Sequence, residues 1–144
     1  METEQKKAFE ERLGLRFNHW SSPFWEGAQN GEVRIQQCRD CGNKMYPPRV
    51  YCTHCLSANI DWIKCSGKGI LYAYSTIYEE PPPRVAKFLS SPYTLALVDL
   101  EEGVRMLTNI VECKPDELKC DMKVEVVFHD IGEGVNLVWF KPTD

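Results

Sequence analysis

Four cysteines in two matched pairs constrain the fold of this chain more than any other feature. The first pair is Cys38 and Cys41, the second is Cys52 and Cys55, and each pair encloses two residues. Two intervening residues allow both sulfurs of a pair to reach one ion, and the loop between the pairs brings the second pair to the opposite side. The spacing therefore predicts a metal-binding ribbon with four thiolate ligands and no open coordination position for a substrate.

Zinc is the metal expected at this site, because closed tetrahedral sites in small modules are typically structural zinc sites. Iron is the alternative, since four sulfur ligands also suit iron, and it would make the chain a stand-alone redox protein. Two disulfides, or a relic ribbon without metal, are the remaining interpretations. His54 lies within the second pair, but four cysteines already complete a tetrahedron, so we do not expect it to bind the metal.

The composition is typical of a soluble globular protein, either one domain or two small units that share a core. The chain has 144 residues with a net charge of -4, and this acidic balance argues against a strong nucleic-acid binder. No stretch approaches the roughly 18 apolar residues of a membrane span, and no signal-peptide core is visible near the start. Seven cysteines, an odd number, fit a reducing compartment, so we expect a cytoplasmic protein that does not contact membranes.

The first segment, residues 1–31, is expected to be helical. The spacing of its apolar residues predicts a first helix that ends at Gly14. A second helix is predicted to begin with Ser22 as the N-cap and Pro23 in the first turn. Three large aromatic residues make this segment unusual: Trp20, Phe24 and Trp25. They either cap the protein's own core or form a docking surface for another subunit.

The second segment, residues 32–64, contains the cysteine pairs and is the predicted ribbon. A short strand is expected at residues 33–37, leading into the first pair. Gly42 follows that pair, where a positive φ angle turns backbone amides towards the sulfurs. Leu56 occupies the matching position after the second pair, so we expect a less relaxed or slightly different turn geometry there.

The third segment, residues 65–144, predicts five strands with a helical turn at residues 114–119. The strands are expected at residues 70–78, 93–100, 104–111, 122–128 and 135–140. Five strands with a short helix between the third and fourth have the element order of an OB-fold barrel. The sequence thus predicts a mainly β protein with N-terminal helices, a rubredoxin-like zinc ribbon and a five-stranded OB-fold barrel.

Ribbon and barrel together resemble the acyl-CoA-associated OB-fold proteins that carry an N-terminal rubredoxin-like zinc ribbon. The matching motifs are PFWEG (23–27), QCRDCG (37–42), YPPR (46–49), CTHC (52–55), DW (61–62), SGKG (66–69), PYTLALVDL (92–100), EGVR (102–105) and KVEV (123–126). Two positions depart from the family pattern. Many relatives have glycine where this chain has Asp121, and a small residue where it has Leu56, but neither change removes a metal ligand.

The resemblance implies a non-catalytic auxiliary subunit of a thiolase-type acyl-CoA enzyme complex. In such a hetero-oligomer a thiolase-like partner binds most of the coenzyme A thioester, and this chain stabilises the partner and helps to form its acyl-CoA site. We expect no catalytic residue here, because no local motif supplies a base for Cys65, Cys113 or Cys120. The alternatives are a partner of an acyl-CoA hydratase, or a nucleic-acid-binding module of ribbon and barrel.

The longest irregular segment, residues 79–92, is a candidate contact loop. Arg84 and Lys87 are its only cations, and Phe88 lies beside them. Cations next to apolar residues would suit the phosphates and pantetheine arm of coenzyme A, or a groove on a partner. The alternative is a mobile barrel loop without a binding role.

Overall fold

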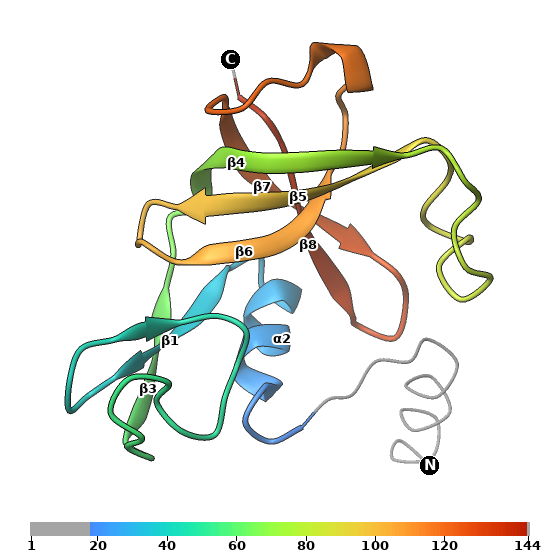
Figure 1. The fold of residues 1–144 in the computed structure, drawn as a ribbon. Helices are drawn as coiled ribbons and strands as arrows, with labels where there is room; N and C mark the ends of the chain where they lie inside the picture. Colours follow the sequence, from blue (N-terminus) through green and yellow to red (C-terminus); the bar gives the residue numbers. More distant parts are fainter. Residues whose placement is uncertain (1–17, 144) are drawn as a thin grey trace.

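Within residues 18–143 the chain forms one α-helix, a small three-stranded sheet and a closed five-stranded barrel (Figure 1). This computed structural model describes residues 18–143. The helix predicted to end at Gly14 lies outside the described residues. The mainly β architecture predicted from the sequence is confirmed.

Helix α2 (Ser22–Gln29) connects the start of the described chain to the ribbon. Ser21 occupies the N-cap position, so the prediction that Ser22 caps the helix was wrong by one residue. The hydroxyls of both serines donate to the carbonyl oxygen of Asn18, at 3.1 and 2.9 Å, instead of accepting from helix amides. Pro23 lies in the first turn, as predicted.

The ribbon is a sheet of three antiparallel strands in the order β2-β1-β3. Its strands are β1 (Arg34–Cys38), β2 (Lys44–Met45) and β3 (Ile60–Lys64). The two outer strands were not predicted, because two residues are too few to give a pattern and β3 has no regular alternation of burial. The central strand β1 ends at Cys38, the first cysteine of the ribbon.

The barrel closes in the order β4-β5-β6-β8-β7, which is the strand order of an OB fold. Its strands are β4 (Lys68–Ile77), β5 (Tyr93–Leu100), β6 (Arg105–Ile110), β7 (Lys123–Asp130) and β8 (Asn136–Pro142). A 3-10 helix, η1 (Pro115–Glu117), lies between β6 and β7, where the sequence predicts a helical turn. Closure leaves every barrel strand paired on both sides.

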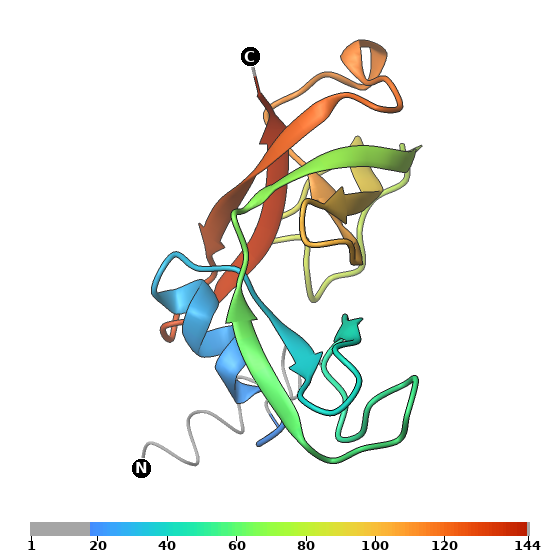
Figure 2. The ribbon, with the colours of Figure 1, turned by 90° about the vertical axis from the view of Figure 1, so that its left-hand side faces the viewer.

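Helix, ribbon and barrel share one hydrophobic core. Phe24 of α2 and Val33 and Ile35 beside the ribbon are buried together with Leu71 and Phe140 of the barrel. Figure 2 shows β3 running on into β4, so the ribbon sheet and the barrel are continuous in the chain. Among the described residues, the helix is too short and too polar to cross a membrane.

Candidate metal centre

The structure brings the four ribbon cysteines together at one point. Their Sγ atoms all lie within 4.8 Å of one another, with 3.5 Å between Cys38 and Cys55 and 3.6 Å between Cys41 and Cys52. A tetrahedral zinc site with bonds of about 2.3 Å places its sulfurs roughly 3.8 Å apart. The arrangement of the four sulfurs therefore fits a single ion held between the two pairs.

The two cysteine pairs end in equivalent turns. The amide of Gly42 donates to the carbonyl oxygen of Cys38 at 2.9 Å, and that of Leu56 donates to the carbonyl oxygen of Cys52 at 3.0 Å. The φ angles are 78° at Gly42 and 64° at Leu56. The turn after the second pair thus resembles the first, but the expectation that it is less relaxed is confirmed, because Leu56 adopts the left-handed conformation that usually favours glycine.

Backbone amides favour the thiolate form at two of the four sulfurs, whereas burial and the neighbouring thiols raise the pKa values of Cys41 and Cys55. The amides of Cys55 and His54 donate to Cys52 Sγ at 3.5 and 3.3 Å, and they lower the pKa of this thiol to about 6. The amide of Cys41 likewise lowers the pKa of Cys38. Both sulfurs belong to buried residues. Because metals bind the thiolate form, donors aimed at these sulfurs favour the charge state that a metal site requires.

Side chains outside the metal ligands tie the ribbon loops together. The amide group of Gln36 donates to the carbonyl oxygen of Arg49 at 2.8 Å and accepts from its amide at 2.7 Å. Asp40 accepts hydrogen bonds from Ser57 and Asn59, which link the first cysteine pair to the loop after the second. The side chain of His54 is exposed.

The three aromatic residues proposed for docking lie in different environments. Phe24 is buried, with its ring 5.3 Å from that of Trp25 and 5.8 Å from that of Tyr46. Trp25 is half-buried against the core. Trp20 is half-buried and meets His19 edge to face at 5.0 Å. Phe24 thus serves the core, and a docking role for the two tryptophans stays a prediction.

The loop between β4 and β5 folds back on the barrel through Phe88. Its ring lies 6.2 Å from that of His129, which stacks on Trp139 at 4.4 Å. Arg84 and Lys87 are exposed. Phe88 thus packs against the barrel while the two cations are exposed, and the role of all three in coenzyme A or partner contact stays a prediction.

Two of the three thiols outside the ribbon, Cys65 and Cys113, have raised pKa values. Burial, followed by the charge of Glu102, raises the pKa of Cys65 to about 12. Burial also raises the pKa of Cys113, whose Sγ lies 3.5 Å from the carbonyl oxygen of Lys114. A reactive cysteine needs a lowered pKa. Cys120 is exposed.

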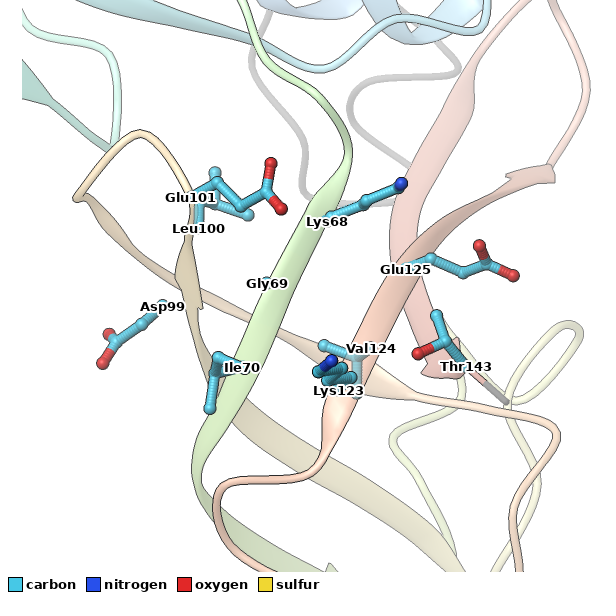
Figure 3. Close-up of a pocket in the computed structure, with 10 residues that line it drawn as sticks. All are labelled: Lys68, Gly69, Ile70, Asp99, Leu100, Glu101, Lys123, Val124, Glu125 and Thr143. Atoms are coloured by element: carbon cyan, nitrogen blue, oxygen red, sulfur yellow. The ribbon is translucent and has the colours of Figure 1, made fainter.

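A pocket that the sequence did not reveal opens between β4, β5 and β7 (Figure 3). Its volume is about 550 Å³, and its lining includes two lysines and three carboxylates: Lys68, Lys123, Asp99, Glu101 and Glu125. Gly69 lies at its centre in Figure 3, and a Cβ atom there would lie 2.6 Å from the carbonyl oxygen of Asp99. These residues come from strands far apart in sequence, so no local sequence motif predicts the pocket.

Comparisons with known proteins identify a zinc ribbon followed by an OB fold. Residues 25–61 match the family described as "ChsH2, rubredoxin-like zinc ribbon domain", and residues 62–129 match "ChsH2, C-terminal OB-fold domain". A solved structure titled "Ltp2-ChsH2(DUF35) aldolase" is 31% identical, with a TM-score of 0.78 over 88% of this chain and 96% of that chain. The chain therefore belongs to the ChsH2-type DUF35 family, which combines a zinc ribbon with an OB fold.

Two curated relatives are subunits of different acyl-CoA enzymes. The "Probable enoyl-CoA hydratase alpha subunit" of Thermomonospora curvata is 33% identical over 143 residues, which are 98% of this chain but 43% of that protein. The "Benzoylsuccinyl-CoA thiolase subunit BbsA" of Geobacter metallireducens is 29% identical over 133 residues, which are 90% of this chain and 85% of that protein. The chain thus spans less than half of the first relative and most of the second.

Proposed function

We propose that this chain is a non-catalytic auxiliary subunit of an acyl-CoA enzyme complex, with a thiolase-like protein as the catalytic partner. The observation that carries the proposal is a metal centre with four protein sulfurs, in a chain that matches a thiolase subunit over most of both lengths. A metal with four protein ligands keeps no position for a substrate. The centre therefore suits a structural role.

The state of the remaining thiols also supports a non-catalytic role. Thiolase-type acyl transfer needs a nucleophilic thiolate with a base nearby. Within residues 18–143, Cys65 and Cys113 have raised pKa values, and the described contacts of His129 are with aromatic rings. We propose that the nucleophile and its base belong to the partner, which also binds most of the coenzyme A thioester.

The ribbon would then be a rigid domain attached to the barrel. Cys38, Cys41, Cys52 and Cys55 would hold zinc, which supplies folding free energy to a segment with little core of its own. Trp20 and Trp25 would contribute to the contact with the partner. Arg84 and Lys87 are exposed on the β4–β5 loop, where they could meet phosphates of coenzyme A or carboxylates of the partner.

A hydratase is the second candidate partner. It is favoured by one observation, the match of 98% of this chain to a probable enoyl-CoA hydratase alpha subunit. Nucleic-acid binding is less well supported. Trp139, a candidate stacking residue, is 8% exposed, and the Arg105 guanidinium that covers Tyr72 is already paired with Asp99.

The test is purification of the tagged chain from its native host at low salt, with mass spectrometry and metal analysis of the same sample. The proposal expects a thiolase-like chain and about one zinc per copy of this chain. A hydratase instead would support the second candidate. Red, iron-containing protein would point to redox chemistry, and recovery of the chain alone or with nucleic acid would refute the auxiliary role. A Cys52→Ser variant is the matched control, because it has the same length as the wild-type chain but should lose zinc.

A further inference from the structure

The outer face of β4, β5 and β6 is unusually apolar for a barrel exterior. In β5 and β6 every second residue is buried, so the residues between them point outwards. Pairing of the strands aligns these positions with outward positions of β4. The outward set is Ile70, Ala73, Ser75, Ile77, Tyr93, Leu95, Leu97, Asp99, Arg105, Leu107 and Asn109. We call this set, with Tyr72 at the β4 bulge, the apolar face.

The centre of the apolar face is a row of three aliphatic residues. Ala73 pairs with Leu97, and Leu97 pairs with Leu107, so the three lie side by side across the strands. Leu107 is 61% exposed, Tyr72 is 49% exposed and Leu95 is 38% exposed. Figure 1 looks towards these three strands. A cluster of large apolar side chains at this exposure usually marks a contact surface.

The opposite side of the barrel is already covered by the protein itself. Trp139 of β8 is 8% exposed and stacks on His129. Helix α2 lies against β8, where Asn136 donates to the carbonyl oxygen of Ala28 at 3.1 Å. The contrast shows that this fold buries the large outward residues of β8 but leaves those of β4, β5 and β6 in contact with solvent.

The chemistry of the apolar face argues against a small ligand or a nucleic acid. Side chains that are half-exposed or more project into solvent, whereas small molecules bind in concave sites that bury most of their surface. Arg105 is the cation of the face, and Asp99 already binds its guanidinium at 2.7 and 3.1 Å. A strand of nucleic acid needs free positive charge along its backbone.

The apolar face is too small to form a stable dimer by contact with the same face of a second copy. Its three strands lie about 4.8 Å apart and span residues 70–77, 93–99 and 105–109, so at a rise of about 3.4 Å per residue they cover roughly 330 Å². A stable interface buries about 800 Å² on each partner, so two copies meeting face to face fall short. The occupant must also cover the adjoining β4–β5 loop, where Tyr78 is 72% exposed and Arg84 and Lys87 are exposed.

We infer that the apolar face is the docking surface for the catalytic partner enzyme, which presents aliphatic and aromatic side chains to it and carboxylates to Arg84 and Lys87. This inference rests on the proposed function, because it assigns a surface to the partner proposed above. Leu107 and Tyr72 form the centre of the contact. The ion pair of Arg105 and Asp99 forms part of the polar rim.

The experiment compares one substitution at two exposed leucines. The probe is the enzyme subunit recovered with the wild-type chain, produced recombinantly, and its affinity is measured by calorimetry. Leu107→Lys should weaken binding by about 30-fold or more, as at the centre of an interface. Leu56→Lys, at a residue that is 77% exposed on the ribbon, should change affinity less than threefold. Zinc content and melting temperature confirm that both variants fold.

Three outcomes would overturn the inference in distinguishable ways. If the wild-type chain recovers no thiolase-like, aldolase-like or hydratase chain, the proposed function fails and the docking surface fails with it. If the wild-type chain binds the enzyme and Leu107→Lys binds it equally well, only the surface is wrong. If the purified chain sediments as a dimer that Leu107→Lys dissociates, a second copy occupies the apolar face.

Discussion

Replacing Leu56 by glycine should tighten metal binding. Leu56 has a φ angle of 64° and a side chain that is 77% exposed, so its truncation removes little packing. The left-handed conformation costs a residue with a side chain about 1–2 kcal/mol, whereas the entropy lost by glycine on folding costs about 0.5–1 kcal/mol. The difference favours glycine by roughly 0.5–1 kcal/mol. Because folding of the ribbon is coupled to metal binding, this is about a two- to fivefold gain in zinc affinity.

The reciprocal change at Gly42 gives a matched control in the same chain. A Cβ atom at Gly42 would meet nothing within 4 Å, so Gly42→Ala introduces the backbone cost without a clash. We expect Gly42→Ala to lower zinc affinity by about as much as Leu56→Gly raises it. Titration against a chromophoric chelator measures both affinities. Equal affinities in wild type and Leu56→Gly, with a loss in Gly42→Ala, would show that the two turns are not equivalent.

Three further predictions concern the barrel. Phe140→Ala should lower the free energy of unfolding by about 3–5 kcal/mol in denaturant titrations, because Phe140 is 0% exposed; a loss under 1 kcal/mol would contradict its central packing. Gly67→Ala should cost about 2 kcal/mol or more, because its Cβ would lie 2.6 Å from Val126 Cγ1 at a φ angle of 80°, and unchanged stability would refute this steric conflict. Arg105 holds the pKa of Asp99 below its usual value, so this carboxylate stabilises the fold above its unfolded pKa of about 3.9 and stops doing so as the pH falls through its lower folded value. Arg105→Gln should therefore flatten the acid loss of stability below about pH 4, and an unchanged acid limb would argue against the pair.

Most of the fold could be predicted from local sequence patterns. The range predicted for the second barrel strand, 93–100, is that of β5, because regular alternation and flanking turn residues define it. The predicted strands 93–100 and 104–111 leave three residues for the turn between them, and Gly103 in that turn takes a φ angle of 91°. The cysteine spacing likewise sufficed to bring four sulfurs together.

Features that depend on tertiary structure were not predictable. The left-handed turn at Leu56 is imposed by the ribbon against the preference of the residue. The pocket of Figure 3 and the apolar face combine residues from separate strands, so only strand pairing brings their members together. The exposure of Leu107 was also not predictable, because the alternation of residues in a strand does not reveal which face of the sheet the rest of the protein covers.

The shared core makes the metal centre relevant to the docking surface. Ile35 of β1 and the preceding Val33 are buried with Leu71 and Phe140, and β1 ends at Cys38, one of the four ribbon cysteines. At the junction with the barrel, the amide of Cys65 donates to the carbonyl oxygen of Val33 at 2.7 Å. Loss of metal would free the end of β1 and loosen this core from one side. A structural ion can thus fix the orientation of the ribbon relative to the barrel, on which we propose that the partner docks.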